Sequence, residues 1–148
     1  MRSLLTITLC LLLMACSATQ RSNTTKEKPA LTGVIWKLAN IQSKDDSTGL
    51  PRAPGLYTLE FHKDGSVAIR ADCNRGRGNW ASETADQLNI TQLITTRAMC
   101  IPRSLHDQFI SDLNDTRSFT LNEGKLYLAM MTDGSILEFF SSPVTQVE

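Results

Sequence analysis

Apolar and polar residues alternate along much of this chain, and the pattern predicts short β-strands joined by turns. Alternation is clearest on both sides of Lys63-Asp64-Gly65, a tripeptide typical of a hairpin turn. The predicted hairpin, residues 56–71, presents one apolar face made of Tyr57, Leu59, Phe61, Val67, Ile69 and Ala71. Further short strands are predicted at residues 33–41, 79–81, 87–90, 93–96, 117–121, 125–130 and 135–140.

The stretch Asp72–Trp80 follows the second strand of this hairpin and contains one of the cysteines. If the alternation of the strand continues by two residues, Cys73 faces the core. Two glycines, Gly76 and Gly78, then indicate that residues 74–78 leave the sheet as a turn. We therefore expect a buried Cys73, followed by a connection and a strand that restarts at residues 79–81.

One segment has helical periodicity, from about Pro102 to Asn114. Pro102 suits a first helical position, and Ser104 with Asp107 is a candidate capping pair. The helix has one apolar stripe, made of Leu105, Phe109, Ile110 and Leu113. One helix among about eight short strands predicts an α+β, mainly β fold, with an antiparallel sheet curled around or packed on the helix.

The N-terminus has the three parts of a secretory signal: basic Arg2, an apolar run at residues 4–13, and the closing tetrapeptide Leu13-Met14-Ala15-Cys16. The apolar run is too short for a membrane-spanning helix, which needs roughly 20 residues. The tetrapeptide resembles a bacterial lipobox, in which the cysteine is lipidated and becomes the mature N-terminus. An ordinary secretory signal, cut after Ala15 or Ala18, is the alternative.

On this interpretation residues 1–15 are a lipoprotein signal peptide, and residues 16–30 are a flexible tether that begins at lipidated Cys16. The tether segment is polar and lacks apolar periodicity. Ser17 resembles the residue that follows the cysteine in bacterial lipoproteins sorted to the outer membrane. We expect the domain, residues 31–141, to lie in the periplasm, and residues 142–148 to form a disordered tail.

Composition and motifs narrow the function only slightly. The 15 basic and 15 acidic residues balance, so nothing indicates nucleic-acid binding. The two histidines, His62 and His106, are isolated in the sequence, and no metal or cofactor site is predicted. Neither a Gly-x-Ser-x-Gly motif nor a defensible Ser-His-Asp arrangement points to a hydrolase. We expect a monomeric protein that is not an enzyme.

Cys73 and Cys100 are expected to form a disulfide, because the periplasm is oxidising and the alternation of the strand predicts that Cys73 faces the core. Two buried free thiols are the alternative. A redox-active pair is disfavoured, since the two cysteines lack Cys-x-x-Cys spacing. Beside Cys73, a candidate anion- or partner-binding loop consists of Asn74, Arg75, Arg77 and Asn79, with glycines that expose backbone amides. A solvated connection is the alternative for this segment.

Four features occur in order between residues 31 and 140. They are the early strand with Trp36 and Leu38, the stretch Asp72-Cys73-Asn74 followed by Gly78 and Trp80, the segment Thr96-Arg97-Ala98-Met99-Cys100, and the late strands with Leu126-Tyr127-Leu128 and Leu137-x-Phe139. In this order and spacing they resemble the META/HslJ domain family. The resemblance implies a cracked, partly open β-barrel of about eight strands packed on one helix.

Members of that family are commonly secreted proteins or bacterial lipoproteins, and some are linked to stress or antibiotic tolerance. The resemblance implies a non-enzymatic envelope lipoprotein with a binding or structural role in envelope stress tolerance. Its expected partners are the membrane, through the N-terminal lipid, and an envelope protein or a hydrophobic ligand.

The alternative function is a lipid or acyl-chain carrier, since the family fold also resembles that of lipid-binding secretion pilotins. The open barrel would then hold the chain against soft apolar side chains, for which the candidates are Met99, Met130, Met131, Phe139 and Phe140. Simple core packing is the competing interpretation of these five residues. A hydrolase or inhibitor of envelope components is the least favoured function.

Overall fold

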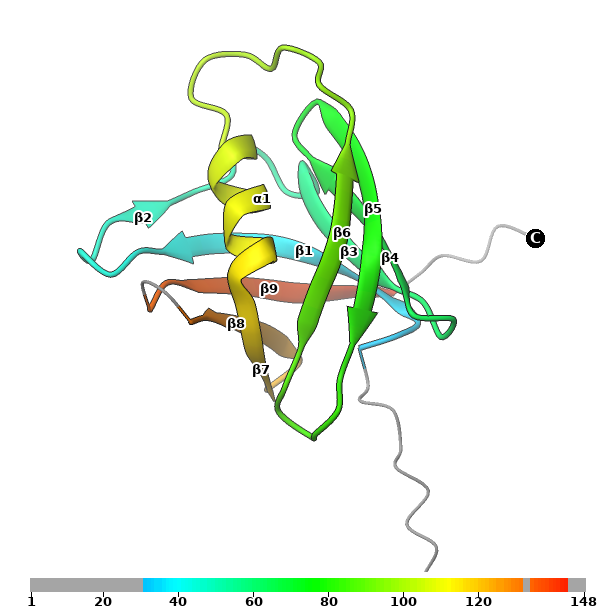
Figure 1. Cartoon of the computed structure of the whole chain (residues 1–148). Helices are drawn as coiled ribbons and strands as arrows, with labels where there is room; N and C mark the ends of the chain where they lie inside the picture. The colour runs from blue at the N-terminus through cyan, green and yellow to red at the C-terminus, as the bar shows by residue number, and fades with distance from the viewer. Residues whose placement is uncertain (1–30, 132–133, 144–148) are drawn as a thin grey trace, which may run out of the picture.

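The computed structural model describes residues 31–131 and 134–143. This part of the chain forms nine strands and one helix (Figure 1). In chain order they are β1 (Val34–Gln42), β2 (Thr48–Gly49), β3 (Tyr57–Phe61), β4 (Ser66–Ala71), β5 (Asn74–Ala81), β6 (Asn89–Thr95), α1 (His106–Asp115), β7 (Thr116–Asn122), β8 (Lys125–Met130) and β9 (Ile136–Pro143). The predicted signal peptide, the tether with Cys16 and residues 144–148 lie outside the described residues.

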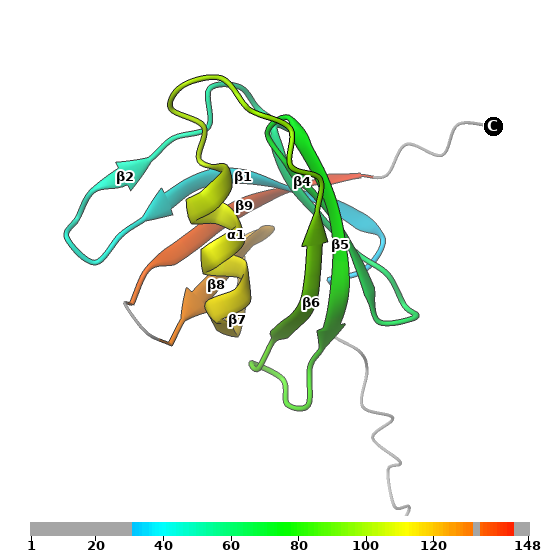
Figure 2. The same cartoon turned by 45° about the horizontal axis from the view of Figure 1, so that its top comes forward.

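The strands form one curled antiparallel sheet in the order β6-β5-β4-β3-β1-β9-β8-β7, with β2 paired to β1. The sheet bends into a half-barrel, and α1 lies across the gap between its two ends (Figures 1 and 2). The gap is bridged at one place, just before β6, where Leu88 N–H donates to the Arg117 carbonyl and Phe119 N–H donates to the Asp86 carbonyl. The predicted mainly β fold, with a curled sheet packed on one helix, is confirmed.

Side chains from the sheet and the helix fill the inside of the half-barrel. Tyr57 meets Phe109 edge to face at a centroid distance of 5.3 Å, and Phe109 lies 6.3 Å from Phe139. The predicted apolar face of the β3–β4 hairpin is buried, and so are Phe109 and Leu113 of the helix stripe, whereas Leu105 and Ile110 are half-buried. Full burial of each large apolar side chain stabilises the fold by about 1.5–3 kcal/mol, so this cluster holds the helix against the sheet.

The structure corrects the prediction for the stretch that follows β4. β4 and β5 are joined by a two-residue turn, Asp72-Cys73, and Asp72 has a φ of 59°. The turn ends the alternation of β4, so Asp72 is buried and Cys73 is exposed, where the sequence predicted a buried Cys73. Residues 74–78, which were predicted to leave the sheet as a turn, form the first part of β5 and pair with β4.

Three predicted boundaries also differ. The helix begins at His106 rather than near Pro102, because Arg103 has a φ of 65° and interrupts helical geometry. Leu105 is the N-cap residue and makes no side-chain cap hydrogen bond, so the expected cap pair of Ser104 and Asp107 does not form, although the Ser104 hydroxyl accepts from His106 N–H. The two short strands predicted at 87–90 and 93–96 are one strand, β6, with an irregularity opposite β5. β9 extends to Pro143, two residues beyond the expected domain boundary at 141.

Candidate functional site

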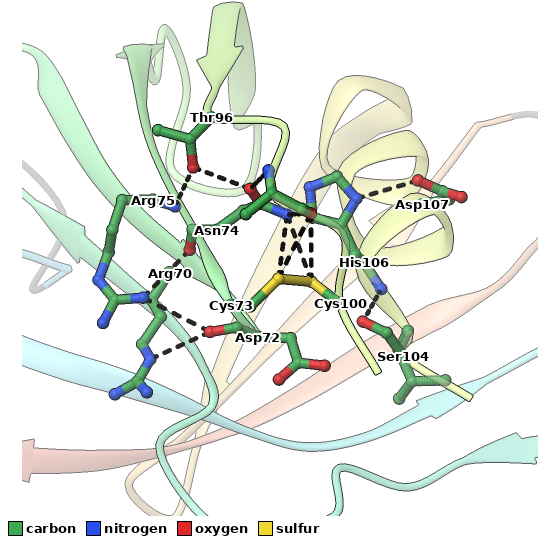
Figure 3. The surroundings of a disulfide bond; sticks show 12 residues. Arg70, Asp72, Cys73, Asn74, Arg75, Thr96, Cys100, Ser104, His106 and Asp107 are labelled. Carbon is green, nitrogen blue, oxygen red and sulfur yellow. Dashed lines mark hydrogen bonds and ion pairs between the residues drawn. A yellow bond between two sulfur atoms is a disulfide. The ribbon is translucent and has the colours of Figure 1, made fainter. Parts of the chain in front are cut away.

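The segment between β6 and α1, here named loop 96–105, lies beside the β4–β5 turn at one end of the half-barrel (Figure 3). The described chain starts at the opposite end, where Thr32 bridges Phe61 beside the β3–β4 hairpin. The six residues of β4 separate the two ends, a distance of about 20 Å. Figure 1 shows the loop and the start of the described chain at opposite ends of the molecule.

A disulfide between Cys73 and Cys100 ties the loop to the turn, with 5.5 Å between the two Cα atoms. The predicted bond is confirmed, although the parity argument that supported it was wrong, because Cys73 sits in the turn and is exposed. The bond joins two residues that are 27 positions apart in the sequence and so closes the chain between them into a loop. Such a constraint stabilises a fold by about 3–4 kcal/mol in the chain-entropy model.

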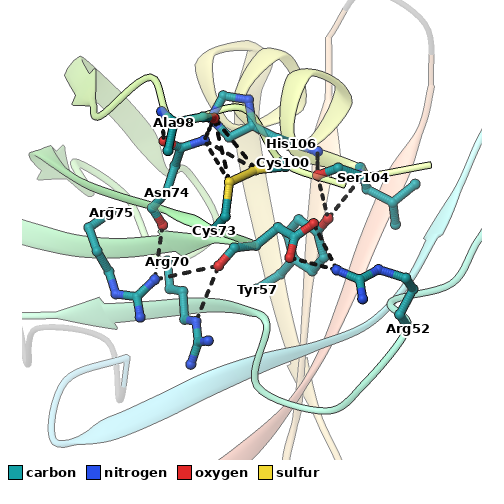
Figure 4. Close-up of polar contacts among 12 residues, drawn as sticks. Arg52, Tyr57, Arg70, Cys73, Asn74, Arg75, Ala98, Cys100, Ser104 and His106 are labelled. Carbon is teal, nitrogen blue, oxygen red and sulfur yellow. Dashed lines mark hydrogen bonds and ion pairs between the residues drawn. A yellow bond between two sulfur atoms is a disulfide. The ribbon is translucent and has the colours of Figure 1, made fainter. Parts of the chain in front are cut away.

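Asn74 is the second attachment of the loop, and its side chain is 2% exposed. Its Oδ1 accepts hydrogen bonds from Ala98 N–H at 2.7 Å and from the Thr96 hydroxyl at 2.8 Å. Its Nδ2 donates to the Ala98 carbonyl at 3.1 Å and lies 3.3 Å from Cys100 Sγ. The carboxamide therefore pairs with the Ala98 backbone as a neighbouring strand would, and holds the loop beside the disulfide (Figure 4).

Asp72 supplies a third attachment on the other side of the turn. Asp72 is 4% exposed, and its carboxylate accepts from Arg52 Nη2 at 2.9 and 3.2 Å. Burial is the largest influence on the pKa of this carboxyl and raises it. Hydrogen bonds from Ser104, Arg52 and Tyr57, together with the charge of Arg52, outweigh burial, so the pKa lies below its ordinary value.

The Tyr57 hydroxyl joins this cluster to the start of the helix. It lies 3.2 Å from Ser104 Oγ and accepts from Leu105 N–H at 2.7 Å. The Ser104 hydroxyl in turn accepts from His106 N–H at 3.2 Å. Loop 96–105 is thus fixed at its centre by the disulfide and Asn74, and at its end by Asp72 and Tyr57.

The clamped loop presents apolar side chains to solvent. Met99 is 99% exposed and Ile101 is 54% exposed, with exposed Arg97 and Arg103 on either side. Between the loop and α1 lies an open pocket of about 680 Å³. Its lining includes Asn74, Arg97, Met99, Ile101, His106 and Asp107.

Comparison with known protein families gives one result for most of the chain: residues 29–144 match the family model of the META domain. The chain belongs to the META domain family. No curated protein matches it. The resemblance stated from Asp72-Cys73-Asn74 and Thr96–Cys100 is therefore confirmed, and in this META domain those two segments are the parts joined by the disulfide and Asn74.

Two solved structures share the fold of this META domain. A protein from Burkholderia xenovorans, solved by NMR, is 22% identical and has a TM-score of 0.61, over 76% of this chain and 83% of that one. A DUF4847 family protein from Bacteroides vulgatus is 17% identical and has a TM-score of 0.54, over 75% of this chain and 94% of that one. At these identities the likeness concerns the fold alone.

His106 and Asp107 are the residues of the META domain that come nearest to a catalytic arrangement. His106 Nδ1 lies 3.0 Å from Asp107 Oδ1, as in the histidine–carboxylate half of a hydrolase triad. His106 Nε2, however, is buried and has no hydrogen-bond partner within the described residues. The nearby Ser104 hydroxyl is engaged by Tyr57 and by the His106 backbone, so the pair lacks an activated nucleophile.

The predicted anion-binding loop is not a single site in the META domain. Its four residues alternate along β5, so that Asn74 is buried while Arg75, Arg77 and Asn79 are exposed. Asn79 Nδ2 donates to Gln92 Oε1 at 2.6 Å. Residues 74–79 pair with β4 on one side, so the predicted loop of exposed backbone amides does not form.

The predicted hydrophobic pocket is also divided. Met130 and Phe139 belong to the packed core, whereas Met99, Met131 and Phe140 are exposed at separate places. Within residues 31–131 and 134–143, no group of three or more His, Cys, Asp or Glu side chains is placed to hold a metal ion. No helix in the same ranges has the length and apolar composition needed to cross a membrane.

Sequence reasoning missed Asn74 and Asp72 as the residues that hold the loop. The signal was present in part, because a buried asparagine or aspartate must find hydrogen-bond partners. The pattern did not indicate the two-residue turn, which buries Asp72 and Asn74 and exposes Cys73, the reverse of the predicted alternation.

Proposed function

We propose that this protein is an outer-membrane lipoprotein whose META domain is a non-enzymatic binding module in the periplasm. Loop 96–105 contacts a protein partner of the envelope, and the complex serves envelope stress tolerance. The observation that carries the proposal is the clamped loop itself: two exposed apolar side chains, Met99 and Ile101, on a segment held by the disulfide, by buried Asn74 and by the Tyr57 hydroxyl.

Rigid presentation of apolar side chains is what a binding surface requires. An interface gains most of its free energy from a few well-placed side chains, and it loses less when the binding segment is ordered beforehand. Met99 contributes little to the fold, since it is 99% exposed. The clamp therefore orders a segment whose exposed side chains add little to stability, which is the arrangement expected of a recognition loop.

The position of the loop is consistent with anchoring through Cys16. The tether would enter the domain beside the β3–β4 hairpin, about 20 Å from the loop along β4. In a lipid-anchored protein this places Met99 and Ile101 at the end farther from the attachment point. A periplasmic partner would bind that end of the domain without displacing the tether.

Two other functions have weaker support. The carrier hypothesis places the acyl chain inside the half-barrel, and Tyr57, Phe109 and Phe139 fill that space. The hydrolase hypothesis would need convergent groups with shifted pKa values. Among the described residues, the carboxyls of lowered pKa, Asp45, Asp64, Asp72 and Glu138, belong to separate local contacts.

Site-specific photo-crosslinking in cells tests the binding surface. A photoreactive residue replaces Met99, Ile101 or Met131, the last being a matched control because it is an exposed methionine outside the loop. We expect one adduct of the same mass from positions 99 and 101 and none from 131. Binding of the partner, once identified and purified, should be weakened by Met99→Asp. Equal adducts at all three positions, or undiminished binding by Met99→Asp, would refute the proposal.

The anchor is tested separately by cell fractionation. Cys16→Ala should move the protein from the membrane fraction to the soluble fraction, because the lipid attachment site is lost. Ser17→Ala is the matched control and should leave the membrane attachment unchanged. Unaltered membrane partitioning of Cys16→Ala would contradict lipid anchoring while leaving the loop experiment valid.

A further inference from the structure

Two arginines stand directly opposite each other on the outer face of the sheet. Arg70 of β4 is paired in register with Arg75 of β5, while the adjacent Ile69, Ala71 and Asn74 face inward. Like charges placed directly opposite in an antiparallel pair destabilise the sheet. A local arrangement that opposes stability is expected where a site serves binding.

Both guanidinium groups contact backbone carbonyl oxygens near the β4–β5 turn. Arg70 Nε and Arg75 Nη1 both donate to the Asp72 carbonyl at 3.4 Å, and Arg75 Nη1 also donates to the Asn74 carbonyl at 3.2 Å. Figures 3 and 4 show the two side chains together at this carbonyl. Within the described residues neither arginine has a carboxylate at ion-pair distance, since the Asp72 carboxylate is taken by Arg52.

Further positive charge lies on the same face. Arg77 follows Arg75 at the next outward position of β5. Lys37 of β1 belongs to the same row of residues paired across neighbouring strands, which runs Lys37–Thr58–Arg70–Arg75. In the part of the chain that the structure describes, Arg77 and Lys37 also have no ion-pair partner.

An acidic residue and a shallow cavity lie near these arginines. The acidic residue is Glu60, which shares a cross-strand row with Ala68 and Arg77, so that β4 separates Glu60 from Arg77. A shallow cavity of about 330 Å³ lies beside Arg75 and Arg77, with Gly76 and Ile94 in its lining.

We propose that this face binds a phosphoryl group between Arg70 and Arg75, with Arg77 at the side. Each planar guanidinium can donate two parallel N–H bonds to phosphate oxygens, and the anion relieves the repulsion between the paired arginines. Inorganic phosphate and the headgroup of an anionic phospholipid share this chemistry. The site lies on the outer face of the sheet and uses other side chains than Met99 and Ile101, through which loop 96–105 is proposed to contact its partner.

The first arm measures phosphate binding to the purified full chain by calorimetric titration at low ionic strength. Arg70→Gln and Arg75→Gln should each weaken the affinity for inorganic phosphate by about tenfold or more, since each removes charge-assisted hydrogen bonds. Lys44→Gln, which removes the same charge from an exposed position outside this face, is the control and should bind as the unaltered protein does. Equal weakening by all three variants would mean non-specific attraction and would overturn the site.

The second arm identifies the source of the phosphoryl group. The same proteins are sedimented with vesicles of phosphatidylcholine alone, or of phosphatidylcholine mixed with phosphatidylglycerol. A lipid headgroup site predicts extra binding to the anionic vesicles that Arg70→Gln and Arg75→Gln abolish and Lys44→Gln retains. Phosphate binding without this extra vesicle binding supports a site for a small free anion. Absence of both kinds of binding overturns the proposal.

Folding of the variants is checked by urea unfolding without phosphate. Arg70→Gln should be at least as stable as the unaltered protein, because it removes the like-charge pair. If Arg70→Gln unfolds more easily, Arg70→Lys decides the question, because it keeps the charge and loses the planar fork. Arg70→Lys should bind phosphate less tightly than arginine and more tightly than glutamine, and unchanged affinity would overturn the paired-guanidinium site.

Discussion

Replacement of Asn74 by alanine tests whether one buried carboxamide holds loop 96–105 in place. The change removes three strong hydrogen bonds, two to the Ala98 backbone and one to the Thr96 hydroxyl. Each such bond contributes about 1 kcal/mol net. Thr96 and Ala98 are exposed, so water replaces part of what is lost. We therefore expect Asn74→Ala to lower the free energy of unfolding by about 2–3 kcal/mol, including the small cavity left in its place.

The effect should be uneven along the chain, and amide hydrogen exchange measures it. The Ala98 amide donates to Asn74 Oδ1 at 2.7 Å, so its protection should disappear in the variant. Amides of β4 pair with two neighbouring strands and should lose only the protection that corresponds to the global change. The disulfide keeps Cys100 attached, so local loosening is expected over residues 96–99 without release of the whole loop.

Asn79→Ala is the matched control, because Asn79 lies on the same strand, faces outward and bonds only Gln92 among the described residues. Asn79→Ala should change the free energy of unfolding by no more than about 0.5 kcal/mol, as most surface substitutions do. If Asn74→Ala costs no more than Asn79→Ala, or if the Ala98 amide keeps its protection, the carboxamide does not hold the loop and the reasoning is wrong.

Three further predictions concern the β4–β5 turn and β5. Replacing Cys73 and Cys100 together by serine should lower the unfolding free energy in urea by about 3–4 kcal/mol, and an unchanged urea midpoint would contradict a stabilising bond. The pKa of Asp72 lies below its ordinary value of 3.8, so the stability it contributes is present above pH 3.8 and is lost as the pH falls through its folded pKa. Asp72→Asn, which suits the same positive φ, should flatten the acid side of the stability–pH curve, whereas an identical curve would refute the ionised assignment. Gly78→Ala should destabilise by about 1–3 kcal/mol in thermal or urea unfolding, because its Cβ would lie 2.6 Å from Leu93 Cδ2 and 2.9 Å from the Thr91 carbonyl oxygen; full stability would show that β6 can move aside.

The hairpin of β3 and β4 could be predicted from the sequence because its two faces differ in burial. Tyr57, Leu59 and Phe61 alternate with polar residues, and the structure buries all three. The stripe on α1 was predictable for the same reason, since Phe109 and Leu113 are fully buried. Patterns of this kind carry information wherever one side of an element faces the core.

β5 could not be predicted in this way, because its glycines serve packing rather than a turn. A Cβ on Gly76 would lie 2.7 Å from Thr95 Cγ2 and 2.8 Å from the Ile94 carbonyl oxygen, so glycine permits the close approach of β6. Sequence alone does not distinguish a glycine needed for close approach from a glycine needed for positive φ.

Asn74 and Arg75 were predicted as candidate anion-binding residues, but the burial of Asn74 and the pairing of Arg75 with Arg70 were missed for the same reason. Their roles depend on a register that begins at the Asp72-Cys73 turn. A turn with only two central residues leaves a weak signal when neither residue is glycine, because the usual Asn-Gly or Gly-x marker is absent.

The Asp72-Cys73 turn gives the loop two attachments that fail under different chemical conditions. Acid protonates the Asp72 carboxylate and weakens its hold on Arg52 and Ser104, but it leaves the Cys73–Cys100 bond intact. A reductant opens the disulfide, but it does not change the charge of Asp72. A protein exposed to a fluctuating environment would therefore keep loop 96–105 in place under either condition alone. Only acid and reductant together would release both attachments.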